Sequence, residues 1–137
     1  MEKELDLVIH GGTLVDAGNT VQADLGIRDG KIVLLGQNLH GREIIDADGL
    51  LVIPGAVDPH VHMEMDAGLA VSSDDFSSGT IAAAWGGTTT ILDFIEPGAD
   101  QTLVEGLADR RAAADGRVAI DYGLHMSLDR ADETTLA

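Results

Sequence analysis

The sequence predicts an α/β protein in which a small layer of β-strands precedes the first units of an incomplete parallel sheet. Over residues 1–54, turn signals follow short apolar runs at the intervals of an antiparallel sheet. From residue 55 onward, apolar strands alternate with helical stretches, which is the order of βαβ units. Three strands with two helices leave the edge of a parallel sheet open. We therefore expect a truncated sequence in two parts, residues 1–54 and residues 55–137.

Each strand expected in the first part is followed closely by a turn signal. We expect strands over residues 5–10, 21–27, 31–35 and 49–53. The signals that follow them are, in turn, Gly11-Gly12, Asp29-Gly30, Gly36 and Pro54-Gly55. Glycine and proline are the strongest breaks in local structure. Their spacing favours hairpins between neighbouring strands.

In the second part we expect strands over residues 56–62, 88–94 and 118–127 and helices over residues 73–85 and 101–114. Asp74 and Asp75 fall in the first turn of the first helix, where acidic side chains suit the helix dipole. The two helices end at residues 86–87 and 115–116, each of which contains glycine. Residues 129–137 have the composition of the start of a further helix without a stop signal. This is a second reason to expect a truncated sequence.

The composition restricts the classes of function. The chain has 137 residues, of which 45% are apolar and 23% charged, as in an ordinary globular protein. Its formal net charge of −16 disfavours nucleic acid and anionic membranes as partners. Because no apolar run approaches about 18 residues, we expect neither a membrane span nor a signal peptide, and a cytoplasmic location. Cysteine is absent, so any metal must be held by histidine and carboxylate.

The chemistry concentrates at the end of the strand expected over residues 56–62. Asp58, His60 and His62 are two residues apart, so on a strand they share one face. The two imidazoles then converge at the carboxyl end of the strand, where barrel enzymes hold catalytic groups. Imidazole suits zinc, nickel, iron or manganese as a ligand. A carboxylate such as Asp58 can orient the ring by accepting a hydrogen bond from the nitrogen that does not bind the metal.

A structural or solvated histidine pair remains the alternative, because two histidines two residues apart also occur by chance. The position of the pair at a strand end, after Pro54-Gly55 and in phase with Asp58, favours a metal. A catalytic zinc site has about three protein ligands and a water, and the sequence shows no convincing third ligand.

Other candidates allow two interpretations each. Met63, Met65 and Leu69 follow the histidine pair and suit an apolar lid over a small ligand, but ordinary loop packing fits equally well. His125 ends the third strand of the second part and is interpreted first as a packed histidine. Asp93 ends the second strand and is interpreted first as a cap or a salt-bridge partner.

Several blocks in this order resemble the dihydropyrimidinase and D-hydantoinase family of cyclic amidohydrolases. They are residues 54–65 (PGAVDPHVHMEM), 74–80 (DDFSSGT), 86–94 (GGTTTILDF) and 121–126 (DYGLHM). The opening run, residues 7–15 (LVIHGGTLV), is similar to the N-terminal β layer of that family. The resemblance covers essentially the whole chain.

The resemblance implies a β-sandwich and a (β/α)₈ TIM barrel. Residues 1–54 would form part of the sandwich, and residues 55–137 the first three barrel strands with their helices. It also implies two divalent metal ions, most often Zn²⁺, with His60 and His62 on the more buried ion. A bridging carboxylated lysine, two further histidines and a catalytic aspartate would lie beyond the end of this chain, which would carry no catalytic residue of its own and be inactive alone.

The implied reaction is hydrolysis of a small cyclic amide or ureide, a dihydropyrimidine or hydantoin ring, by metal-activated hydroxide. The stretch from Met63 to Val71 would lie over the exocyclic group of the substrate, and the full-length enzyme would be a homotetramer. Allantoinase or dihydroorotase is one alternative, but such relatives typically carry arginine where this chain has Glu64. A non-catalytic, dihydropyrimidinase-related scaffold is another, and the presence of both His60 and His62 argues against it.

Overall fold

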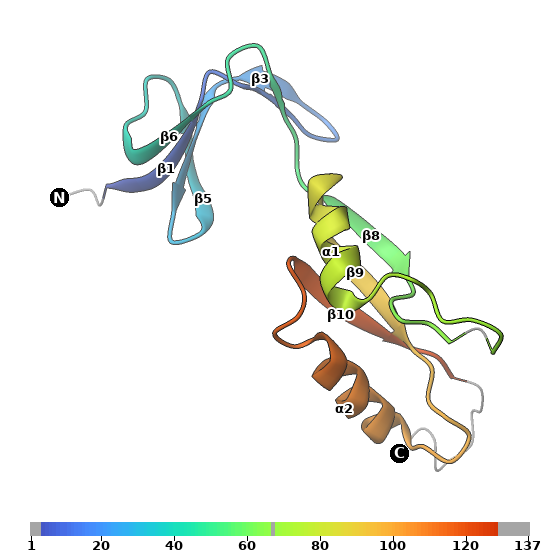
Figure 1. The fold of residues 1–137 in the computed structure, drawn as a ribbon. Helices are drawn as coiled ribbons and strands as arrows, with labels where there is room; N and C mark the ends of the chain where they lie inside the picture. Colours follow the sequence, from blue (N-terminus) through green and yellow to red (C-terminus); the bar gives the residue numbers. More distant parts are fainter. Residues whose placement is uncertain (1–3, 67, 129–137) are drawn as a thin grey trace. The chain divides into compact units, whose positions relative to one another are not determined.

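The computed structural model describes residues 4–66 and 68–128. The chain divides into two compact units, residues 1–54 (unit 1) and residues 55–137 (unit 2), shown in Figure 1. No helix among the described residues is long and apolar enough to cross a membrane. The helix expected over residues 129–137 lies outside the described residues.

In its described part, unit 1 has strands arranged in two sheets. The strands are β1 (Leu5–His10), β2 (Thr13–Val15), β3 (Thr20–Gln22), β4 (Asp24–Arg28), β5 (Lys31–Gly36), β6 (Gly41–Asp46) and β7 (Leu51–Val52). One sheet has the order β5-β4-β1-β6 and the other the order β3-β2-β7.

The pairing in unit 1 is mixed, whereas the turn spacing predicted an antiparallel sheet. β1 pairs with β4, β4 with β5 and β2 with β3 in the antiparallel sense. However, β1 pairs with β6 and β2 with β7 in the parallel sense. Both parallel partners come late in unit 1 and return to strands near its start, which local turn signals do not reveal. The single strand expected over residues 21–27 is also wrong, because the chain leaves one sheet and enters the other at Ala23.

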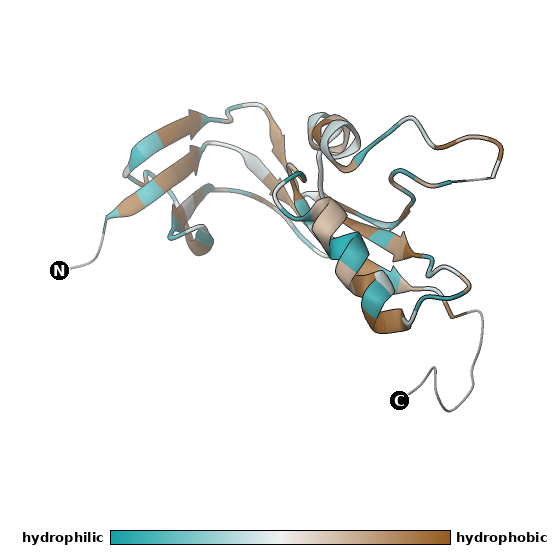
Figure 2. Ribbon diagram, turned by 60° about the horizontal axis from the view of Figure 1, so that its bottom comes forward, coloured by the Kyte–Doolittle hydropathy of each residue, from teal (hydrophilic) through white to brown (hydrophobic). Residues whose placement is uncertain are grey.

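A buried carboxylate ties together three segments of unit 1. Asp24, at the start of β4, is 4% exposed, and its side chain accepts the backbone N–H groups of Gly11 and Leu39 at 2.9 Å each. Hydrogen bonding from Gly11, and next from Leu39, holds the pKa of the Asp24 carboxyl below its ordinary value. Several apolar side chains of β5 and β6 are exposed, for example Ile32 and Ile44. Figure 2 colours the ribbon by hydropathy and shows hydrophobic segments, in brown, in the strands of unit 1.

Unit 2 has alternating strands and helices, as the sequence predicted. They are β8 (Ala56–Val61), α1 (Phe76–Trp85), β9 (Thr88–Ile95), α2 (Leu103–Ala114) and β10 (Asp121–Met126). The sheet has the order β10-β9-β8, and both strand pairs are parallel. This arrangement follows from the sequence, because a helix between two strands allows them to run in the same direction.

Both helices begin with reciprocal caps. Asp75 precedes α1 as its N-cap, rather than lying in its first turn, and accepts the Ser78 N–H at 2.6 Å. This bond lowers the pKa of the Asp75 carboxyl. Thr102 caps α2 and accepts the Glu105 N–H at 3.2 Å, while the Glu105 carboxylate accepts the Thr102 N–H. Such boxes satisfy backbone donors that a helix leaves free at its start.

One apolar cluster joins the helices to the sheet. Phe76 of α1, Ile91 of β9 and Ala114 of α2 are all buried in it, together with Met63. Both helices therefore cover the same face of the sheet. Along β9, Ile91, Asp93 and Ile95 are buried, whereas the residues between them are only partly buried. This alternation gives β9 a helix-covered face and an opposite face, which carries Phe94.

Candidate metal centre

The strand that carries the histidine pair contains a bulge. Asp58 of β8 pairs with Ile91, but Val61 pairs with Asp93, so three steps along β8 match two steps along β9. Pro59 lies within the bulge and has no N–H for the ladder. The N–H of His60 is donated to the carboxylate of Asp58 at 3.2 Å instead of to a neighbouring strand. A bulge of this kind re-aims side chains at the end of a strand.

The structure brings the two imidazoles together. The Nε2 atoms of His60 and His62 lie 3.2 Å apart, and the ring centroids 5.2 Å apart. Two nitrogens bound at about 2.05 Å to a tetrahedral zinc ion would lie about 3.3 Å apart. The separation therefore fits two ligands of one metal ion. It also fits a hydrogen bond between a neutral ring that donates and one that accepts.

Phe94, near the end of β9, packs against both rings of the pair. Its ring centroid lies 4.5 Å from that of His60 and 5.0 Å from that of His62, with which it is stacked. His125 of β10 contacts the same phenyl ring at 5.1 Å. His125 thus lies near the pair, and its ring contacts Phe94 rather than either histidine of the pair. The sequence did not reveal that Phe94 packs against the histidine pair, because Phe94 belongs to an ordinary apolar strand pattern.

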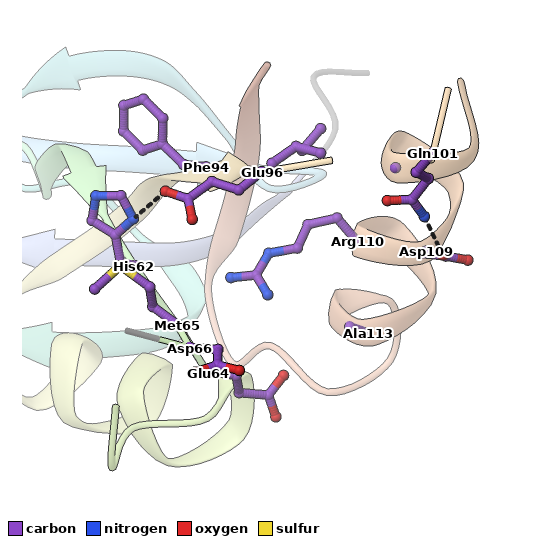
Figure 3. A pocket seen from close by; sticks show the side chains of 12 residues that line it. His62, Glu64, Met65, Asp66, Phe94, Glu96, Gln101, Asp109, Arg110 and Ala113 are labelled. Atoms are coloured by element: carbon purple, nitrogen blue, oxygen red, sulfur yellow. Dashed lines mark hydrogen bonds and ion pairs between the residues drawn. The ribbon is translucent and has the colours of Figure 1, made fainter. Parts of the chain in front are cut away.

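The carboxylate of Glu96 lies beside one ring of the histidine pair. Its Oε1 lies 3.9 Å from Nδ1 of His62, as Figure 3 shows. The sequence predicted this orienting role for Asp58, whose carboxylate instead accepts the backbone N–H of His60. The bulge at Pro59 explains the difference, because it breaks the regular two-residue alternation on which the prediction depended.

The lid interpretation does not hold for Met63, whose side chain is 8% exposed and lies in the core of unit 2. Its sulfur lies so close to Gly79 that a Cβ added there would be 2.5 Å away. Met65 is half-buried, and its N–H is donated to the Ser72 hydroxyl at 2.8 Å. Leu69 is fully exposed. Of the three candidates, Met65 alone lines the cavity beside the histidine pair.

That cavity has a volume of about 380 Å³ and opens beside His62. Figure 3 shows side chains from the loops after β8 and β9 and from α2 around it, among them Glu64, Glu96 and Arg110. Its size is within the usual range for small-ligand pockets, about 300 to 1,000 Å³. Among residues 4–66 and 68–128, no three histidine, cysteine or carboxylate side chains group closely enough to hold a metal ion.

Residues 51–136 match the sequence profile of the amidohydrolase family. The chain belongs to the amidohydrolase family. Its resemblance to the D-hydantoinases and dihydropyrimidinases, predicted from the sequence blocks, is confirmed. The D-hydantoinase of Geobacillus stearothermophilus is 45% identical over 131 residues, which are 94% of this chain and 28% of that protein. Dihydropyrimidinase 1 of Caenorhabditis elegans is 43% identical over 127 residues, 89% of this chain and 26% of that protein.

The fold of this amidohydrolase chain agrees with the sequence comparison. A crystal structure of D-hydantoinase superposes with a TM-score of 0.90 at 45% identity, covering 94% of this chain and 28% of the other. The amidohydrolase chain thus spans less than a third of the length of these relatives.

Sequence reasoning missed three residues around the histidine pair of the amidohydrolase chain. Phe94 lies near the end of β9 and Glu96 directly follows that strand, and their only signal was their place at the carboxyl end of a strand. Arg110 gave no signal, because its partners lie 17 and 47 residues earlier in the chain. Asp93 is the salt-bridge partner that its position suggested, since Arg110 pairs with it at 2.5 Å.

Proposed function

We propose that the protein containing this chain is a metal-dependent amidohydrolase that opens a dihydropyrimidine or hydantoin ring by hydrolysing a C–N bond of the cyclic amide. The observation that carries the proposal is the 3.2 Å separation of the Nε2 atoms of His60 and His62. The pair lies at the carboxyl end of a parallel strand, where barrel enzymes hold their catalytic groups. Support comes from the relatives named D-hydantoinase and dihydropyrimidinase.

In this proposal β8, β9 and β10 are the first three strands of a (β/α)₈ TIM barrel, and residues 1–54 belong to a small β-sandwich domain. The order β10-β9-β8 with parallel pairs supports the assignment, because successive strands of such a barrel pair in chain order. The helix-covered face of the sheet would then point outward, and the face with Phe94 would point to the barrel interior.

His60 and His62 would hold one of two divalent ions, with zinc as the first candidate, through their Nε2 atoms. When bound, such ions would supply Lewis-acid chemistry, lowering the pKa of a bound water and polarising the ring carbonyl. Phe94 packs against both rings and limits their freedom to turn. Glu96 lies beside Nδ1 of His62 and is placed to orient it. The bridging carboxylated lysine and the catalytic aspartate implied by the family resemblance are assigned to no residue of this chain.

The contacts of Glu64 support a ring substrate without a carboxylate. Glu64 lines the cavity and pairs with Arg117 at 3.0 Å. The chain therefore presents an acidic group where allantoinase-like and dihydroorotase-like sequences carry arginine. An acidic group there repels a carboxylate substrate.

The assembly and location belong to the same proposal. We infer a homotetramer in the cytoplasm that acts on small cyclic amides or ureides and not on nucleic acid or membranes. The formal net charge of −16 supports the exclusion of phosphate backbones and anionic lipids as partners.

The test uses the protein at its natural full length. Ring opening is measured with dihydrouracil and a monosubstituted hydantoin. It is also measured separately with allantoin and with dihydroorotate, the substrates of the alternative functions. Bound metal is measured by elemental analysis. Removing the metal with a chelator is expected to abolish ring opening, and adding Zn²⁺ to restore it.

Two variants complete the test. His60→Ala is expected to lose both zinc and ring-opening activity, whereas His40→Ala, at an exposed histidine in unit 1, is expected to keep both. Unchanged zinc content and turnover in His60→Ala would contradict the metal assignment. A preference for allantoin or dihydroorotate would contradict the proposed substrate class but not the proposed metal-dependent hydrolysis.

A further inference from the structure

The strand beside the histidine pair contains a fully buried carboxylate. Asp93 of β9 is 0% exposed and points to the helix-covered face, away from Phe94. One of its oxygens accepts the N–H of Met63 at 2.9 Å. The other accepts Nε of Arg110 at 2.6 Å. A buried charge is tolerated only when its partners are in place, so these contacts fix Asp93 and the groups around it.

Arg110 of α2 completes the arrangement. Its Nη2 group pairs with Asp93 at 2.5 Å and also donates to the carbonyl oxygen of Met63. The guanidinium lies over the ring of Phe76, 4.6 Å from its centroid, and the side chain is only 19% exposed. A planar fork of donors suits this geometry, whereas a lysine would offer one point charge. Asp93 and Arg110 together bind both backbone polar groups of Met63.

The contacts of Met63 also restrict the backbone of His62, the residue before it. The N–H of Met63 belongs to the same planar peptide group as the carbonyl of His62. That carbonyl accepts a bond from the Ser72 hydroxyl at 3.4 Å. The peptide is therefore held on both sides, which fixes the backbone rotation that aims the imidazole of His62. Phe94, the neighbour of Asp93 on β9, stacks on that imidazole from the opposite face of the sheet.

We propose that Asp93 and Arg110 form a backbone clamp on Met63 that sets the position of the His62 imidazole, which makes both of them positioning residues of the metal centre. The inference rests on the proposed function, because it assumes that His62 binds a metal. In this arrangement the clamp lies on the helix-covered face of the sheet, and the imidazole of His62 stacks on Phe94 at the opposite face.

The test compares Arg110→Lys with Arg111→Lys in the protein at its natural full length. Arg111 is an exposed arginine on the same helix, so its replacement controls for the general effect of changing a cation on α2. The affinity of the metal-free protein for Zn²⁺ is measured by competition with a chromophoric zinc chelator. The thermal midpoint of the metal-free protein is measured in parallel, and hydrogen exchange is followed at the Met63 amide.

Arg110→Lys is expected to weaken zinc binding by about 10-fold or more, as for other groups that orient a metal ligand. It is also expected to speed exchange at Met63, while Arg111→Lys changes neither. A folded Arg110→Lys protein with unchanged zinc affinity would overturn the clamp, as would equal losses in both variants. If Arg110→Lys does not fold, Asp93→Asn decides, because it keeps the size of that side chain and weakens its pairing with Arg110. Unchanged affinity in that variant would also overturn the proposal.

The same assay separates this inference from the proposed function. His62→Ala is measured beside the other variants. Zinc affinity that depends on His62 but not on Arg110 overturns the clamp alone. Zinc affinity that does not depend on His62 overturns both proposals.

Discussion

Phe76→Ala tests whether one side chain supports both the core of unit 2 and the arginine above it. Phe76 is 0% exposed and packs with Met63, Ile91 and Ala114. Truncating a buried phenylalanine costs about 3 to 5 kcal/mol. Loss of the ring beneath the Arg110 guanidinium, 4.6 Å from its centroid, adds about 0.5 to 1 kcal/mol. We therefore expect unit 2 to lose about 4 kcal/mol of stability against opening.

The assay is hydrogen exchange of the β9 amides in the metal-free, full-length protein, because it reports the opening of this unit by itself. A loss of about 4 kcal/mol corresponds to exchange about 1,000-fold faster. Trp85→Ala is the control, since Trp85 is an aromatic residue on the same helix that is 89% exposed. We expect that control to change stability by less than about 0.5 kcal/mol. Exchange less than about 10-fold faster in Phe76→Ala, or equal effects of both variants, would refute the argument.

Three further predictions concern stability. Thr102→Ala removes the N-cap of α2 and should destabilise that helix by about 1 kcal/mol, seen as faster exchange of its first amides; unchanged exchange would contradict the cap. Gly55→Ala puts a Cβ 2.7 Å from Cβ of Thr89, so it should cost about 1 to 3 kcal/mol through strand displacement. An unchanged melting temperature would contradict that clash. Because the pKa of Asp24 is lowered on folding, its contribution is present above about pH 4 and declines as pH falls through the folded pKa. As pH falls below about 4, the stability of unit 1 should therefore decline less steeply in Asp24→Asn than in the unchanged protein. Equal slopes of stability against pH would refute this prediction.

The elements of unit 2 could be predicted from the sequence, because each depends on local chemistry. β-branched residues form β9, and Gly86-Gly87 separates it from α1. The predicted elements and the observed ones differ only at their ends, for example at α1, where Asp75 is the cap rather than part of the first turn. Periodicity and capping act within a few residues, so they are visible without knowledge of the fold.

The pairing of unit 1 could not be predicted in the same way. β6 was missed because Arg42 and Glu43 near its start interrupt the apolar pattern, and its partner β1 is about 36 residues away. The change of sheet at Ala23 falls inside a run in which apolar and polar residues alternate, and neither neighbour of Ala23 is a glycine or proline that would mark it. Long-range pairing decides both features, and turn signals carry no information about it.

At the candidate site, the period of a strand correctly placed His60 beside His62. The same rule failed for Asp58, because Pro59 adds a bulge that shifts the alternation. Met63 appeared to be a loop residue but is held in the core by segments distant in the sequence. The metal assignment itself stays a prediction.

The turn after the histidine pair limits which side chains position 64 can carry. Glu64 has a left-handed backbone, with φ of 50°, and its carboxylate shares Arg117 with Asp75, at 3.0 and 3.3 Å. An arginine introduced at position 64 would stand beside Arg117 as a second cation with one carboxylate between them. An arginine at position 64 would therefore favour a compensating exchange at Arg117, some fifty positions downstream, before or together with that change.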